Sequence, residues 1–238
     1  MDIVGKSTLV TGASRGIGRE IARAYCAHGG RVIACARSGE HLESLEQECR
    51  SESGELATVI ADVTDEHDRN KVVEMAIERY GQIDVLVNNA GILGPREQIA
   101  EYPDDIWDQV IEVNLNAVFH LTKLVLKHML DRNRGRIINV TSGVGVRGSS
   151  RWGAYAVSKF GVEGLTQVLA DELRGSSVGV NAVNPGPIAT DMRAKAYPDE
   201  DPETIPAPSD IMDVFLYLAA QQNGEANGER YEAQEFQL

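Results

Sequence analysis

The chain has 238 residues, of which 42% are hydrophobic, so it is long enough to bury one large core. Its formal net charge of −13 excludes non-specific binding to nucleic acid or to an anionic membrane, because both require a positive protein surface. No stretch approaches the roughly 18 consecutive apolar residues of a membrane span and no secretion signal is visible, so we expect a single cytoplasmic domain over residues 1–238.

Short β-branched runs alternate along the chain with longer segments of helical periodicity. This alternation predicts an α/β fold of the Rossmann type: a doubly wound, mainly parallel seven-stranded sheet with helices on both faces. We expect the main helices at residues 18–28, 154–173 and 210–220. The expected strands lie near residues 8–10, 31–35, 57–61, 85–88, 136–140, 178–183 and 231–236.

A glycine-rich turn follows the first predicted strand and runs from Thr11 to Gly18 with the spacing G-x-x-x-G-x-G. Glycines allow a tight turn and let the backbone approach a phosphate, which the N–H groups at the start of the following helix attract. Taken alone, such a turn is either a phosphate-binding loop or a structural bend.

Tyr155 and Lys159 are four residues apart in a predicted helix, so both side chains lie on one face. A neighbouring ammonium favours the phenolate, which predicts a lowered pKa for Tyr155 and a role in acid–base catalysis; the alternative is a surface pair without a role. Ser142 stands just beyond an apolar strand, where ligands of such sheets bind. Asn114 is a polar residue in an amphipathic stretch, either a satisfied core amide or a member of a proton relay.

Together these motifs resemble the short-chain dehydrogenase/reductase (SDR) family over nearly the whole chain. The glycine-rich turn matches the family's TGxxxGxG loop, Asn88 to Gly91 its NNAG motif, and Asn184-Pro185-Gly186 the segment that holds the nicotinamide. The resemblance implies a catalytic tetrad of Asn114, Ser142, Tyr155 and Lys159. The residues that it implies for cofactor binding are Gly12, Ser14, Arg15, Gly16, Ile17, Gly18, Arg37, Ser38, Asp62, Val63, Asn89, Ala90, Gly91, Tyr155, Lys159, Pro185, Gly186, Ile188 and Thr190.

The mechanism that the resemblance implies is the interconversion of a carbonyl and an alcohol by hydride transfer. Tyr155 gives or takes the proton at the substrate oxygen, and Ser142 stabilises the charge on that oxygen. Lys159 lowers the phenol pKa and holds the nicotinamide ribose, while Asn114 fixes a water that connects the site to solvent. The alternative is an NADP(H)-binding sensor or regulator without significant turnover.

The end of the second predicted strand predicts NADP(H) as the cofactor. NAD-specific relatives carry there an aspartate that binds the adenosine ribose, whereas this chain has Ala36. Arg37 and Ser38 follow, and we expect Arg15 to project toward the same region, so two cations and a hydroxyl would surround the 2′-phosphate.

The carboxyl-terminal fifth departs from the usual family pattern and looks like the YciK-like branch of bacterial members. After Thr190 an acidic, proline-containing segment, residues 191–208, replaces the usual lid. The substrate is therefore open between a 3-oxoacyl thioester and a general ketone or aldehyde, with a quinone or sugar as further options. Arg132, Arg134 and Arg136 either form a landing patch for an acidic carrier or merely solvate a loop.

The remaining expectations concern partners and metals. The resemblance implies a homotetramer or homodimer built from helices at residues 104–130 and 154–173. A small-molecule carbonyl or alcohol is the expected ligand, with neither nucleic acid nor membrane as a partner. The scattered histidines and three cysteines predict no catalytic metal and no disulfide, with Cys26 and Cys35 in apolar surroundings and Cys49 in polar ones.

Overall fold

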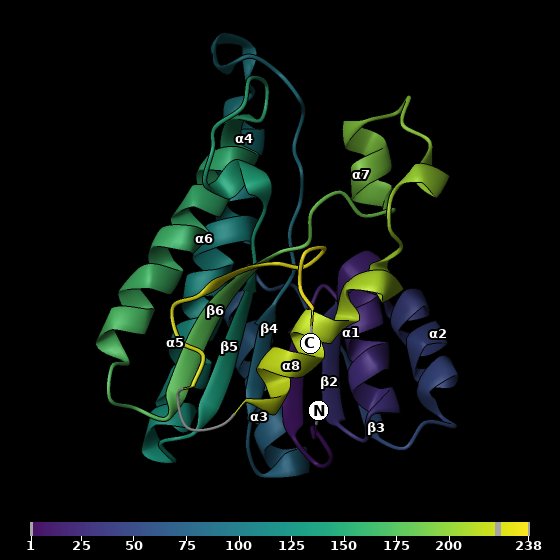
Figure 1. Cartoon of the computed structure of the whole chain (residues 1–238), viewed down its shortest axis with the longest axis vertical. Coiled ribbons are helices and arrows are strands. Elements are labelled where there is room, and N and C mark those ends of the chain that lie inside the picture. Colours follow the sequence, from purple (N-terminus) through teal and green to yellow (C-terminus); the bar gives the residue numbers. More distant parts are fainter. Residues whose placement is uncertain (1, 222–224, 238) are drawn as a thin grey trace.

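The computed structural model describes residues 2–221 and 225–237 and confirms the predicted doubly wound α/β fold (Figure 1). Its strands form one sheet in the order β3-β2-β1-β4-β5-β6-β7, and every neighbouring pair is parallel. The strands are β1 (Ser7–Thr11), β2 (Arg31–Ala36), β3 (Glu55–Ile60), β4 (Val85–Asn88), β5 (Gly135–Val140), β6 (Val178–Asn184) and β7 (Arg230–Glu232).

The helices cover both faces of this sheet, and one helix, α7, stands apart above its upper edge (Figure 1). Short 3₁₀ turns at Ile99–Glu101, Gly143–Gly145, Pro202–Thr204 and Pro208–Ile211 connect the elements. The α-helices are α1 (Gly16–Ala27), α2 (Gly39–Cys49), α3 (Glu66–Tyr80), α4 (Asp104–Ile111), α5 (Ala117–Asp131), α6 (Gly153–Glu172), α7 (Asp191–Ala196) and α8 (Met212–Ala220). No described helix is both long and apolar enough to cross a membrane.

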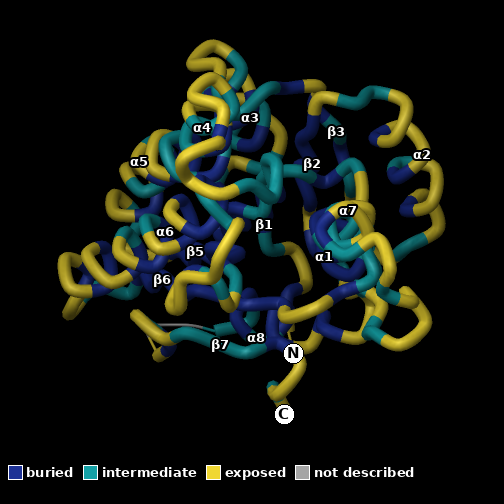
Figure 2. The backbone as a smooth tube through the Cα atoms, turned by 90° about the horizontal axis from the view of Figure 1, so that it is seen from above, coloured by how far each residue is buried: buried dark blue, intermediate teal, exposed yellow. Residues whose placement is uncertain are grey.

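Two apolar cores lie on opposite sides of the sheet, because successive side chains of a strand point to opposite faces. Val10 packs into the core beneath α1, α2 and α8, and its neighbour Leu9 packs into the core beneath α3, α5 and α6. The inner strands β2, β1, β4, β5 and β6 are therefore largely buried, the edge strands β3 and β7 are partly exposed, and the outer helix faces are exposed (Figure 2).

Three expectations about the elements need correction. The last strand ends at Glu232 rather than near residue 236, because the chain turns there: the N–H of Glu235 donates to the carbonyl of Glu232 at 3.1 Å. The single helix expected at residues 104–130 is α4 and α5, joined by a π-helical segment at Glu112–Asn116. Cys49 is buried like the other two cysteines, and all three are free thiols.

Candidate active site

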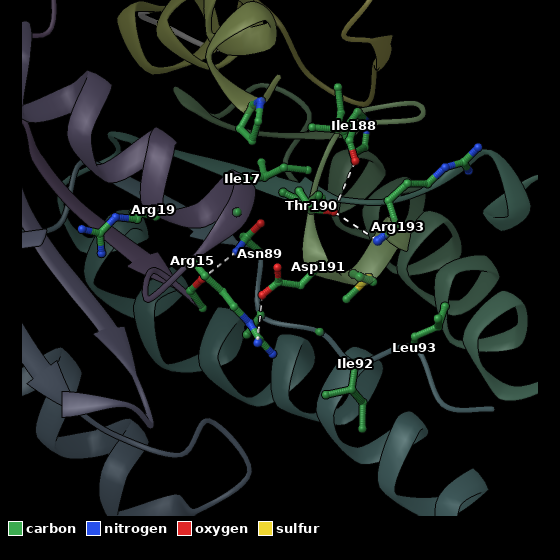
Figure 3. Close-up of a pocket in the computed structure, with 18 of the residues that line it drawn as sticks. Arg15, Ile17, Arg19, Asn89, Ile92, Leu93, Ile188, Thr190, Asp191 and Arg193 are labelled. Carbon is green, nitrogen blue, oxygen red and sulfur yellow. Dashed lines mark hydrogen bonds and ion pairs between the residues drawn. The ribbon is translucent and has the colours of Figure 1, made fainter. Parts of the chain in front are cut away.

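A cleft of about 840 Å³ opens at the carboxyl ends of the strands, where the strand order reverses between β1 and β4. Residues that follow β1 to β6 line it, together with the amino-terminal part of α6 and with α7. Figure 3 labels some of them, from the glycine-rich turn and α1, the segment after β4, and the start of α7. The members of the predicted set that line the cleft are Gly12, Ser14, Arg15, Gly16, Ile17, Arg37, Ser38, Asp62, Val63, Asn89, Ala90, Gly91, Ser142, Tyr155, Lys159, Pro185, Gly186, Ile188 and Thr190.

The other two predicted residues, Gly18 and Asn114, do not line the cleft but contact residues that do: Gly18 lies against Asn89, and Asn114 is hydrogen-bonded to Ile92.

The glycine-rich turn has the backbone of a phosphate cradle. Gly12 and Gly16 have positive φ angles of 65° and 57°, a region that side chains rarely allow. A Cβ atom on Gly18 would lie 2.2 Å from Nδ2 of Asn89 and 2.5 Å from the carbonyl oxygen of Gly12. The first turn of α1 has no side-chain cap from Arg15, so its N–H groups are available to an anion. These features fit the diphosphate of a dinucleotide.

Asn89 joins the glycine-rich turn to the segment that follows β4. Its Nδ2 donates to the carbonyl oxygens of Thr11 at 2.9 Å and Gly12 at 3.2 Å. In return, Oγ1 of Thr11 accepts hydrogen bonds from the N–H groups of Asn89 and Ala90, each at 3.0 Å. These bonds fix the turn and the NNAG segment as one unit.

The basic corner of the cleft differs in part from the expectation. Arg37 lies 3.8 Å from a carboxylate oxygen of Asp62, and its side chain is 64% exposed, so it remains accessible to a ligand. Arg15 is paired instead with Asp191 of α7 at 3.3 Å, rather than turned toward Arg37 (Figure 3). Asp191 attracts Arg15 because the start of α7 stands directly across the cleft, a proximity that no local pattern reveals.

Hydrogen bonds also stabilise the side chains at this corner, among them the charged form of the Asp62 carboxyl group. Burial alone would raise the pKa of Asp62, but hydrogen bonds from Thr64 and the charge of Arg37 hold that pKa below its usual value. Ser38 shares a 3.0 Å hydrogen bond with Nδ1 of His41, which also lines the cleft. His41 was not among the predicted residues; its place in the first turn of α2, soon after Arg37, is the only signal for it in the sequence.

Tyr155, Lys159 and Ser142 come together at the deep end of the cleft. Tyr155 and Lys159 lie one turn apart on α6 and are both buried, while Ser142 follows β5 at the start of a 3₁₀ turn. Nζ of Lys159 donates to the carbonyl oxygen of Val140 at 2.8 Å and lies 5.7 Å from the centre of the Tyr155 ring. The pair is therefore buried rather than on the surface, and its catalytic role stays a prediction.

The electrostatics of this pair correct one expectation. Burial raises the pKa of Tyr155 to about 12, although a hydrogen bond with Ser142 opposes the rise. Burial also lowers the pKa of Lys159 to about 8, and the charge of Glu163 opposes that fall. The pKa of Tyr155 is therefore raised in this structure rather than lowered as predicted, because burial penalises the charged phenolate.

Asn114 lies in the π-helical segment and is fully buried. Its Oδ1 accepts from the N–H of Ile92 at 2.8 Å, and its Nδ2 donates to the carbonyl of Ile92 at 2.9 Å and to Oγ of Ser158 at 3.2 Å. The side chain is thus a satisfied core amide that fixes the segment after β4. A role in a water relay stays a prediction.

Capping and turn contacts hold the segment that is predicted to bind the nicotinamide. Thr190 caps α7 by accepting a hydrogen bond from the N–H of Arg193 at 3.3 Å (Figure 3). Gly186 has a φ of 73°, and Nε2 of Gln234 donates to the carbonyls of Pro185 and Pro187 at 3.1 and 2.7 Å. The end of the chain therefore supports the segment that lines the cleft.

Aromatic and apolar side chains form the wall beside Tyr155, and nothing in the sequence motifs singles them out. Trp152 lies 5.6 Å from the Tyr155 ring, measured between centroids. The guanidinium of Arg96 stacks between Trp152 at 4.6 Å and Tyr197 at 4.9 Å, which ties the segment after α7 to the start of α6. The apolar side chains that line this end are Ile92, Leu93, Val113, Trp152 and Met192.

Comparison with known proteins identifies the family. The model for short chain dehydrogenases matches residues 6–201. The chain belongs to the short-chain dehydrogenase family. It is 39% identical to the uncharacterized oxidoreductase YciK of Escherichia coli, over 95% of this chain and 90% of that protein. It is also 39% identical to the 3-oxoacyl-[acyl-carrier-protein] reductase FabG of Thermotoga maritima, over 96% of both chains.

A solved structure of an SDR protein shares the fold. The short chain dehydrogenase of Escherichia coli CFT073, crystallised in complex with NADPH, superimposes with a TM-score of 0.90 at 36% identity, over 98% of both chains. Among the residues described for the present chain, no three His, Cys, Asp or Glu side chains gather as metal ligands.

The glycine cradle generates a prediction about nucleotide binding. Gly18→Ala places a Cβ against Asn89 and Gly12, and overpacking of this kind costs about 1–3 kcal/mol, so we expect NADPH affinity to fall roughly tenfold or more. Fluorescence titration with NADPH measures the dissociation constant. Gly148→Ala is the control, because a Cβ there meets no atom within 4 Å. An unchanged dissociation constant for folded Gly18→Ala would contradict the cradle.

Proposed function

We propose that this short-chain dehydrogenase is an NADP(H)-dependent oxidoreductase that interconverts a carbonyl and an alcohol, with Tyr155 as the acid and base. The observation that carries the proposal is the burial of Tyr155 and Lys159 beside Ser142, at the deep end of a cleft whose other end is a phosphate cradle. A sensor needs only the cradle, and it gives no reason to bury a phenol and an ammonium together.

The residues of the cleft support NADP(H) as the cofactor. The glycine-rich turn and the start of α1 would hold the diphosphate, with Asp62, Val63 and the NNAG segment beside the adenosine. Arg37 and Ser38 would bind the 2′-phosphate, and Arg15 would join them on leaving Asp191. A related structure contains NADPH, which agrees with this assignment. When bound, the cofactor supplies or accepts the hydride.

The chain's own residues would manage the proton and the charge. With a pKa of about 12, the phenol of Tyr155 stays protonated at neutral pH and can donate to a substrate oxygen, which favours reduction. The Ser142 hydroxyl would hydrogen-bond the same oxygen as negative charge develops. Lys159, held by the carbonyl of Val140, would place its ammonium beside the nicotinamide ribose. The segment 191–208 would act as the substrate lid.

Two substrate classes fit the site: a 3-oxoacyl thioester, as for the FabG relative, and a general ketone or aldehyde. The apolar wall beside Tyr155 suits the carbon chain of either. The arginines considered as a carrier-landing patch are poorly placed, because Arg136 is buried at the amino end of β5 and Arg132 is paired with Asp84 at 2.8 Å. Both lie at the edge of the sheet opposite the cleft.

The direct test of this function is NADPH consumption with a panel of aldehydes, diketones and 3-oxoacyl thioesters. We expect turnover with at least one class, and product analysis should give one alcohol for each NADPH consumed. Tight NADPH binding with no turnover across the panel would favour the sensor alternative.

We predict that Tyr155→Phe abolishes most turnover while it leaves the fold and NADPH affinity nearly unchanged. The substitution removes the proton donor and almost no volume, and general acid–base catalysis contributes about a hundredfold to ten-thousandfold. The measurements are kcat with the best substrate of the panel and the NADPH dissociation constant. More than half of the wild-type kcat in the variant would rule out the proposed role.

We predict that Arg37→Asp reverses the preference for NADPH over NADH. The change removes a cation and adds repulsion toward the 2′-phosphate, and one charge-assisted hydrogen bond contributes about 1.5–3 kcal/mol, roughly tenfold or more. The ratio of kcat/KM for the two cofactors decides the matter. A wild-type enzyme that uses NADH as well as NADPH would refute this role of Arg37.

We further propose that the protein is a homotetramer or homodimer built on α5 and α6. Phe119 of α5 and Val157, Phe160 and Val168 of α6 are large hydrophobic side chains that are 44–56% exposed. A partner copy would remove this apolar surface from water. Sedimentation at micromolar concentration should give a species of twice or four times 25.9 kDa, and a purely monomeric species would contradict the proposal.

A further inference from the structure

The last strand reaches the catalytic end of the cleft through one arginine. Arg230 of β7 extends toward α6, where its Nε donates to Oε1 of Glu163 at 2.9 Å. Its Nη2 donates to the backbone carbonyl of Ser142 at 3.4 Å, and the same side chain is also paired with Glu232. Arg230 thereby connects the end of the chain to the serine that would bind the substrate oxygen.

Glu163 places a negative charge beside the buried lysine. It lies four residues after Lys159 on α6, hence on the same face, and its side chain is only 8% exposed. A buried carboxylate is costly unless a cation or hydrogen-bond donor satisfies it, and Arg230 does so here. The charge of Glu163 opposes the loss of the Lys159 proton that burial promotes.

We propose that Glu163 and Arg230 are positioning residues of the active site: Glu163 keeps Lys159 charged, and Arg230 holds Glu163 and the Ser142 backbone in place. The proposal rests on the proposed function, because it concerns the same proton-transfer site. It also gives a role to the carboxyl-terminal strand, the region where the sequence departs most from the usual family pattern.

The two residues should act on Lys159 in opposite directions. In Glu163→Gln the negative charge is lost, so the ammonium is favoured less and the pKa of Lys159 falls below about 8. In Arg230→Gln the charge of Glu163 is no longer offset, so that pKa rises. Tyr155 lies beside Lys159 on α6, and Glu232 of β7 pairs with Arg230; both substitutions leave these two residues in place.

The experiment is a pH titration of Lys159 itself, which requires no substrate. The full-length protein is prepared with ¹³C-labelled lysine, and Lys159→Gln assigns the Lys159 Cε resonance. We expect the midpoint to fall by about half a pH unit or more in Glu163→Gln and to rise by a similar amount in Arg230→Gln. The double variant, which keeps a neutral hydrogen-bonded pair, should return toward the wild-type midpoint.

Asp171→Asn and Arg174→Gln are the matched controls, since these residues form an exposed ion pair at the end of the same helix. Midpoints that move no further than in these controls, or that move in the same direction in both test variants, would overturn the proposal. If the wild type reduces no carbonyl of the panel, the proposed function fails but this titration still decides the charge relation.

The contact between Arg230 and the Ser142 carbonyl is tested separately, by steady-state kinetics with a substrate that the panel identifies. Arg230→Gln should lower kcat severalfold and leave the KM for NADPH unchanged, because the serine backbone shifts while the cradle does not. Arg230→Lys should restore part of kcat, since lysine keeps the charge but not the forked geometry. An unchanged kcat in folded Arg230→Gln would overturn this part of the proposal.

Discussion

The close contact between the glycine-rich turn and Asn89 is the constraint on which the rest of the site depends. It joins segments that are 77 and 78 residues apart, at the point where the strand order reverses and the two halves of the sheet meet. Only glycine at position 18 leaves room for the Asn89 amide. This contact joins two of the segments that line the cleft, and the segments after β5 and β6 line the same cleft.

Burial governs the chemistry at the other end of the same cleft. It raises the pKa of Tyr155 and lowers that of Lys159, so a protonated phenol and a readily titrated ammonium lie side by side at neutral pH. Such a pair suits proton donation to a carbonyl oxygen more than proton removal from an alcohol. Because the pair is buried, backbone groups of the fold hold its side chains in place: the carbonyl of Val140, for example, accepts a hydrogen bond from Lys159.

The local pattern of the sequence is sufficient for the sheet, its helices and the glycine-rich turn, because these depend on periodicity and on residue types close together in the chain. It does not reveal the pairing of Arg15 with Asp191, the bonds between Asn114 and Ile92, or the Arg96 stack on Trp152. Each of these joins segments that are distant in the sequence. The direction of the Tyr155 pKa shift was missed for a related reason: the i, i+4 spacing indicates a neighbouring charge but not the depth of burial.

The central claim is that hydride and proton reach one substrate carbonyl in this cleft. The most direct measurement supplies NADPH that carries deuterium at both C4 positions of the nicotinamide, with a carbonyl compound from the panel, and locates the label in the product by mass spectrometry. The account predicts one deuterium on the carbinol carbon in the wild type, and loss of that product in Tyr155→Phe. Bound NADPH that transfers no deuterium to any carbonyl of the panel would contradict it.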